Sequence, residues 1–151
     1  MKNSLKLCLI VLFGMFLLGS CTTDKTFIAK GVNLKKYEYA SIVKGQTLHG
    51  AKTDIEIEPG IYEAIESTRL QMVGERRVSD LTEEQKGKLV LVKYTATSSE
   101  KESVITVGFE DYMTGKTVAT CRSSNHSAWT RQKDVDRAIR KLNDRIEKIW
   151  K

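Results

Sequence analysis

Cys121, His126 and Asp111 are the side chains whose types could form a nucleophilic active site. In such a site a cysteine attacks as its thiolate, a histidine accepts the proton, and a carboxylate orients the imidazole. His126 follows Cys121 by five positions, a short separation that does not by itself bring the two side chains together. A cysteine on a strand is usually a small apolar filler. The sequence therefore predicts a structural role for Cys121, with a Cys121-dependent periplasmic enzyme as the alternative.

Metal binding requires three or four ligands. Apart from carboxylates, the mature chain offers only His49, His126 and Cys121, and these residues have no paired spacing. We therefore expect neither a metal nor a cofactor.

Two further motifs have simpler structural interpretations. Thr114-Gly115-Lys116 lacks the upstream glycine of a phosphate-binding loop and precedes a strand, so it predicts a hairpin turn. The carboxylate pairs Glu83-Glu84 and Glu110-Asp111 are interpreted as a solvated charge run and a strand end. No catalytic residue is expected among them.

The C-terminal segment carries the whole positive excess of the mature chain. Residues 131–151 hold eight Lys or Arg and four acids, a net of +4, whereas residues 22–130 hold fifteen of each sign. Five cations lie opposite the apolar arc of the expected helix: Lys133, Arg137, Arg140, Lys141 and Lys148. They form a solvated face or, in the alternative, contact anionic lipid headgroups or cell-wall polymer. No aromatic platform interleaves the charges, so nucleic acid is not an expected partner.

The first 20 residues have the layout of an export signal. Lys2 and Lys6 form a basic start, and residues 7–18 form an apolar stretch too short to span a bilayer. Leu18-Gly19-Ser20-Cys21 resembles a bacterial lipobox. This resemblance implies that Cys21 carries a thioether-linked diacylglycerol and an acyl chain such as palmitate, enough for stable anchoring. An ordinary secretory signal ending beside a chance cysteine is the alternative.

The anchoring signal also predicts a location and a division of the chain. Thr22, rather than an aspartate, follows Cys21, which by resemblance to the usual sorting rule implies the outer membrane, on either face. We expect a signal peptide over 1–20, the lipidated cysteine and a short tether over 21–35, and a single domain over 36–151. The fourteen residues 22–35 span at most about 50 Å. In the alternative, Phe27 and Ile28 pack back on the domain.

The pattern of strands and helices predicts an α+β fold with an antiparallel or mixed sheet of about four strands and two helices on one face. The expected strands cover 36–43, 89–96, 103–112 and 117–122, and the 89–96 strand is expected to be buried on both faces. One helix has Pro59 in its first turn and ends at Gly74, and the other covers 130–150. The expected core between sheet and terminal helix comprises Val90, Val92, Ile105, Val107, Ile139, Leu142 and Ile146.

This order of elements, with Asp111-Tyr-Met-Thr-Gly-Lys116 in the hairpin, resembles a family of small bacterial outer-membrane lipoproteins of unknown function. It is more loosely similar to the TolB amino-terminal fold and to lipoprotein activators of penicillin-binding proteins. The resemblance covers residues 36–150 and brings no established activity.

The expected function is a non-catalytic interaction module, anchored in the outer membrane, that docks a protein or an envelope polymer. An activator-like regulator of cell-wall synthesis is an alternative, because the loose resemblance includes such proteins.

Overall fold

The structure, a computed structural model, describes residues 24–43, 46–47, 54–98, 102–126 and 131–151. The expected signal peptide, Cys21 and His49 lie outside these ranges. The described elements are β1 (Lys25–Ile28), η1 (Leu34–Lys36), β2 (Tyr39–Ile42), β3 (Gln46–Thr47), α2 (Asp54–Glu66), β4 (Gln71–Met72), η2 (Glu75–Asp80), α3 (Glu83–Lys86), β5 (Leu89–Ser98), β6 (Ser103–Asp111), β7 (Thr117–Asn125) and α4 (Arg131–Trp150).

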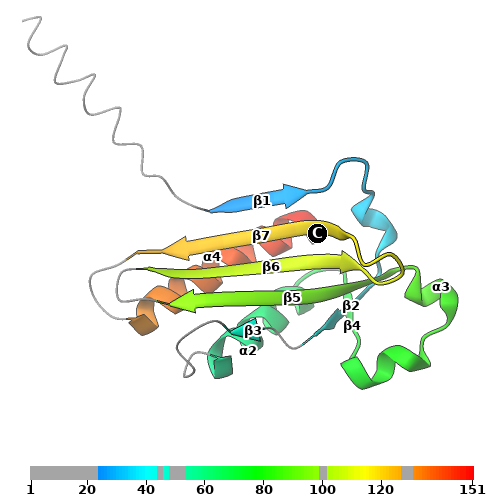
Figure 1. Cartoon of the computed structure of the whole chain (residues 1–151), viewed down its shortest axis with the longest axis horizontal. Helices are drawn as coiled ribbons and strands as arrows, with labels where there is room; N and C mark the ends of the chain where they lie inside the picture. The colour runs from blue at the N-terminus through cyan, green and yellow to red at the C-terminus, as the bar shows by residue number, and fades with distance from the viewer. Residues whose placement is uncertain (1–23, 44–45, 48–53, 99–101, 127–130) are drawn as a thin grey trace, which may run out of the picture.

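One mixed sheet forms the centre of the fold (Figure 1). Its strands run in the order β1-β7-β6-β5-β2-β4, and the two-residue β3 pairs with β5 off this path. The pairs β1–β7, β6–β7 and β5–β6 are antiparallel, whereas β2 and β3 run parallel to β5 and β4 runs parallel to β2. The predicted α+β class and mixed sheet are confirmed. The expected number of about four strands is wrong, because β1, β3 and β4 are too short to show an alternating pattern.

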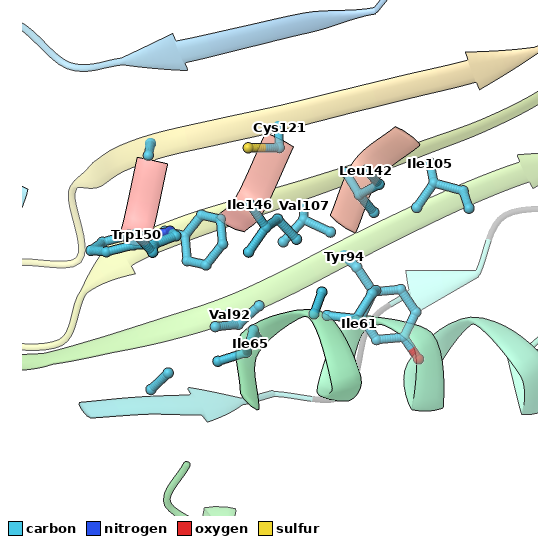
Figure 2. Close-up of a cluster of buried hydrophobic side chains, with 14 of the residues drawn as sticks. Ile61, Ile65, Val92, Tyr94, Ile105, Val107, Cys121, Leu142, Ile146 and Trp150 are labelled. Atoms are coloured by element: carbon cyan, nitrogen blue, oxygen red, sulfur yellow. The ribbon is translucent and has the colours of Figure 1, made fainter. Parts of the chain in front are cut away.

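Helices α2 and α4 lie behind the sheet in Figure 1 and pack against each other. Their apolar faces meet alternate side chains of β5, β6 and β7 in one core (Figure 2). Six of the seven residues expected to be buried there are at most 1% exposed: Val90, Val92, Ile105, Val107, Leu142 and Ile146. The seventh, Ile139, is partly buried and packs against the edge of the core.

The opposite face of β5 is covered at Leu89, which is buried, and open from Lys93 onward. Lys93 and Thr95 are exposed there, between the buried Val92, Tyr94 and Ala96 of the helix-covered face. The expectation that this strand is buried on both faces therefore holds only at its start, where Leu89 and Val90 are both 0% exposed, and is wrong from Lys93 onward. The apolar run at its start ends at Lys93, and the rest of the strand alternates as a one-sided strand does.

Two expected boundaries also differ. Helix α2 begins at Asp54, so Pro59 lies inside it rather than in its first turn. It ends at Glu66, well before Gly74, because the Ser67 and Thr68 hydroxyls donate to the carbonyls of Ala64 and Ile65, at 2.8 and 2.6 Å. Hydroxyl groups that bond the last helical carbonyls compete with continuation of the helix.

The segment expected to be a tether contributes structure to the domain. Residues 25–28 form β1, which pairs with β7 through the register Lys25 to Arg122 and Ile28 to Ala119. All four β1 residues are exposed, which is why their side chains give no sequence signal for a strand. Backbone pairing rather than side-chain burial holds this edge of the sheet.

Among the described residues, no helix is long and apolar enough to cross a membrane.

Candidate functional site

Cys121 lies in the core beneath α4 and is 0% exposed (Figure 2). Burial raises the pKa of its thiol to about 11, because the low-dielectric surroundings disfavour the thiolate. A hydrogen bond with Thr26 and the charge of Arg145 oppose this increase without cancelling it. The thiol has the surroundings of an inert structural cysteine.

The other two members of the candidate nucleophilic set lie elsewhere. His126 is exposed just after the end of β7, whereas Asp111 ends β6 beside the hairpin turn. Cys121 pairs with Val107 in the middle of the hairpin, so the three side chains do not converge.

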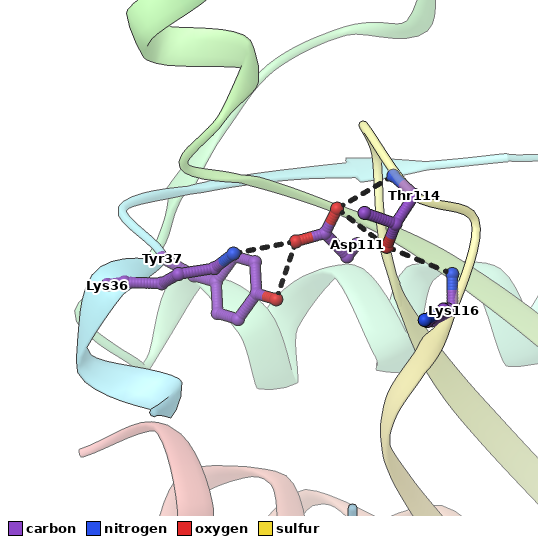
Figure 3. Close-up of polar contacts among 5 residues, drawn as sticks. All are labelled: Lys36, Tyr37, Asp111, Thr114 and Lys116. Carbon is purple, nitrogen blue, oxygen red and sulfur yellow. Dashed lines mark hydrogen bonds and ion pairs between the residues drawn. The ribbon is translucent and has the colours of Figure 1, made fainter. Parts of the chain in front are cut away.

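Asp111 is the centre of a polar cluster that holds the hairpin turn against the end of η1 (Figure 3). Its Oδ2 accepts from Lys36 Nζ and from the Tyr37 hydroxyl, both at 2.8 Å. Its Oδ1 accepts from the backbone N–H and the hydroxyl of Thr114, at 2.9 and 3.0 Å. Gly115 follows with φ of +66°, a conformation that glycine adopts without strain.

This cluster explains the hairpin motif in physical terms. The predicted turn at Thr114-Gly115-Lys116 is present, and Asp111 closes it through an Asx-type contact with Thr114. Burial alone would raise the pKa of Asp111, but the hydrogen bonds from Lys36, Tyr37 and Thr114 outweigh it and lower the pKa to about 2. The carboxylate is therefore ionised at neutral pH and serves as a structural acceptor.

The carboxylate pairs singled out in the sequence form surface ion pairs. Glu83 pairs with Lys86 and Glu84 with Lys88, at 2.8 and 3.1 Å. Glu110 pairs with Lys93 across β5 and β6 at 2.5 Å. Within the described ranges, no group of three His, Cys, Asp or Glu side chains could hold a metal ion.

The five predicted surface cations of α4 lie on two different surfaces, the outer face of the helix and a groove beside β1. Lys133, Arg137 and Arg140 are exposed on its outer face. Lys141 and Lys148 instead line an open groove between α4 and β1. The groove has a volume of about 710 Å³, and its lining residues are Thr26, Ile28, Lys141, Asp144, Arg145, Lys148 and Ile149.

Asp24 holds two of the cations that line this groove. Its Oδ1 accepts from the Ser124 backbone N–H at 2.7 Å, and its Oδ2 lies 3.7 Å from Lys141 Nζ and 3.6 Å from Arg145 Nη2. Arg145 Nη1 also donates to the Thr26 hydroxyl at 3.4 Å. Among the described residues, no carboxylate lies within ion-pair distance of Lys148. Of the three lining cations, Lys148 is thus the one without an ion pair to a described residue.

Sequence reasoning missed Arg145, Thr26 and Asp24 as parts of this site. The spacing of Lys141, Arg145 and Lys148 at i, i+4 and i+7 already places three cations on one side of a helix. The alternative in which Phe27 and Ile28 pack back on the domain came nearest to the contribution of β1, but the strand joins the sheet through its backbone while both side chains stay exposed.

No protein-family model matches the chain, and no curated protein matches it. Two solved structures of the PelC dodecamer from Paraburkholderia phytofirmans, one of them a point variant, share its fold. Their TM-scores are 0.60 for the variant and 0.59 for the other, with 7% and 9% sequence identity. In each case the match covers 82% of this chain and 98% of the PelC chain. At such low identity the similarity establishes a common fold and nothing further.

Proposed function

We propose that this chain is a non-catalytic module of the bacterial envelope, lipid-anchored to the outer membrane through Cys21, that docks a protein or an envelope polymer. The observation that carries the proposal is the exposed basic face of α4, formed by Lys133, Arg137 and Arg140. The exposed Asp136 shares this face, which keeps a net positive charge and attracts partners of the opposite sign. The likeness to an envelope-lipoprotein family, proposed from the sequence, supports the same function.

The surroundings of the catalytic candidates also support a docking role. The thiol of Cys121 is enclosed and has a raised pKa, and Asp111 is engaged by Lys36, Tyr37 and Thr114. Neither group is presented to a substrate.

The short connection between Cys21 and β1 supports a partner near the membrane. Only residues 22–24 separate Cys21 from β1, so Cys21 lies within about 14 Å of Lys25 along the chain. An activator that must reach an inner-membrane synthase needs a longer connection. The reach of the chain therefore favours a partner at or near the anchoring membrane over the activator-like alternative.

The similar structures are dodecamers. We propose that copies of this chain also associate with one another. Such an assembly would present several basic α4 faces to one partner and bind it with higher avidity. Light scattering on the purified full chain measures this directly. A single mass equal to one chain at all concentrations would contradict self-association.

Crosslinking in cells tests the docking function. The double charge reversal Arg137→Glu with Arg140→Glu is expected to lose the crosslinked partner of the wild-type lipoprotein. The matched control reverses Arg76 and Arg77, two exposed cations of η2 on another part of the domain. Equal loss in both variants, or retention in both, would overturn the assignment of the partner to α4.

A further inference from the structure

The groove between β1 and α4 combines an anion-binding wall with an apolar lining. Lys141, Arg145 and Lys148 follow one side of α4, while Ile28 and Ile149 contribute apolar surface. Ile28 is 44% exposed, so its apolar surface is accessible in the groove, whereas its neighbour Phe27 lies on the opposite face of β1. A ligand suited to this site carries a negative group beside an apolar portion.

The charges in the groove favour a ligand with a single negative charge. Three cations line it, Asp144 also lines it, and Asp24 bridges Lys141 and Arg145, which leaves an excess of one positive charge. Asp24 holds two of the cations in fixed positions. Lys148, without an ion pair among the described residues, supplies the excess. A phosphodiester carries one negative charge and several acceptor oxygens, and it matches this arrangement.

The groove also lies close to the proposed anchor. Asp24, which contacts the lining cations Lys141 and Arg145, follows Cys21 by three residues, a reach of about 10 Å at full extension. An acyl chain on Cys21 would therefore hold the groove within reach of the lipid headgroups. Lysine and arginine side chains near a membrane surface are attracted to anionic lipids.

We infer that the β1–α4 groove binds the phosphodiester headgroup of an anionic phospholipid of the anchoring membrane, with Lys148 and Arg145 on the phosphate and Ile28 and Ile149 against the glycerol and first methylenes. The inference rests on the proposed lipid anchoring. Headgroup binding fixes the orientation of the domain on the bilayer and leaves the outer face of α4 free for its partner.

The test uses the full chain in a neutral detergent and short-chain phospholipids as probes. Dihexanoyl phosphatidylglycerol is titrated against the wild type, and amide chemical shifts of β1 and α4 are followed by NMR. Phosphatidylcholine of the same chain length tests the need for net negative charge, and inorganic phosphate tests the need for the lipid portion. We expect saturable shifts at Thr26, Ile28 and Lys148 with phosphatidylglycerol, and at least tenfold weaker binding of the other two probes.

The decisive variant is Lys148→Gln, since Lys148 takes no part in the contacts that hold β1. It is expected to weaken phosphatidylglycerol binding about tenfold, as the loss of one charge-assisted contact does. Arg140→Gln removes the same charge from the outer face of the same helix and is expected to change binding less than twofold. Equal weakening in both variants would show attraction to overall charge and overturn the groove assignment. Equal binding of phosphatidylcholine or of inorganic phosphate would overturn the assignment to an anionic lipid.

The two proposals fail separately. If Lys148→Gln loses phosphatidylglycerol binding while its crosslinked partner is retained, the groove binds lipid and the outer face binds the partner. If wild type shows no phosphatidylglycerol binding while partner capture depends on Arg137 and Arg140, the headgroup site is wrong and the docking function stands. Recovery of the wild-type protein in the soluble fraction rather than the membrane fraction would instead refute the lipid anchoring that both proposals include.

Discussion

Gly60 of α2 lies directly against Ile139 of α4, so close that a Cβ on Gly60 would come within 2.7 Å of the Ile139 Cγ2 methyl. Real Cβ atoms essentially never approach another heavy atom this closely. The methyl sits on a β-branched carbon, whose χ1 rotation is restricted in a helix. The absence of a side chain at Gly60 therefore sets how closely the two helices approach.

Gly60→Ala is expected to destabilise the domain by about 1–3 kcal/mol, because overpacking outweighs the better helix propensity of alanine. Denaturant unfolding measures the change. Gly74→Ala, with open space around its Cβ position, is the control and should be neutral or slightly stabilising. Combining Gly60→Ala with Ile139→Ala should cost less than the sum of the two single changes. Strict additivity would show that the two residues do not interact.

Asp111→Asn is expected to lower stability by about 1.5–3 kcal/mol at pH 7, since hydrogen bonds to a charged acceptor are lost from Lys36, Tyr37 and Thr114. The folded pKa of Asp111 is about 2, below its ordinary value of 3.8. The ionised form is thus favoured by folding, and its contribution is complete above about pH 5 and lost as the pH falls towards 2.

The difference in unfolding free energy between wild type and Asp111→Asn should accordingly shrink between pH 5 and pH 2. Glu110→Gln provides the comparison, because its ion pair with Lys93 is at the surface, where such pairs contribute about 0–1 kcal/mol. A pH-independent difference for Asp111→Asn would contradict the role of its charge.

Leu142→Ala is expected to cost about 2–5 kcal/mol, because Leu142 is 0% exposed between α4 and the sheet and its truncation leaves a cavity. The midpoint of denaturant unfolding should fall markedly. Arg140→Ala, on the exposed face of the same helix, should shift the unfolding free energy by no more than about 0.5 kcal/mol. Similar midpoints for Leu142→Ala and wild type would mean that α4 does not pack in this way.

Cys121 should resist alkylation in the folded domain. With a pKa of about 11, about one thiol in a thousand is ionised at pH 8, and that thiol is enclosed. The full chain with Cys8→Ser and Cys21→Ser leaves Cys121 as its remaining thiol. Labelling should be at least about a hundredfold slower in buffer than in guanidinium chloride. Rapid labelling in buffer, or loss of partner capture in Cys121→Ala or His126→Ala, would contradict the structural role of Cys121 and favour a Cys121-dependent enzyme.

Cys21→Ser is expected to abolish fatty-acid labelling and to release the protein from membrane fractions, because the lipid-bearing thiol is gone. Cys8→Ser, a change inside the apolar stretch of the export signal, is the matched control and should keep both properties. Unchanged labelling of the Cys21 variant would refute the lipobox interpretation.

The sequence predicted those elements whose side chains alternate between core and solvent. The strand over 103–111 and the C-terminal helix are examples, since burial alternates along β6 and repeats with helical spacing along α4. Strand β1 gave no such signal, because all four of its residues are exposed and its backbone pairs at the sheet edge. Residue type alone does not show such pairing.

The candidate site was foreseen only in part, for the same reason. Lys141 and Lys148 were identified from the spacing of cations along a single helix. Their association with Thr26 and Asp24 depends on contacts between segments more than a hundred residues apart. The structural role of Asp111 likewise depends on Lys36 and Tyr37, which lie 75 and 74 positions earlier in the chain.

Trp150 is 0% exposed and packs against Tyr37 and Phe109, with ring centroids 6.0 and 5.0 Å away. Strand β1, near the other end of the described chain, pairs with β7. The core therefore closes only after Trp150 has been translated and has left the ribosome. Until then a nascent chain of this design has no complete core, which is the condition a protein needs if it is to be threaded across a membrane before it folds.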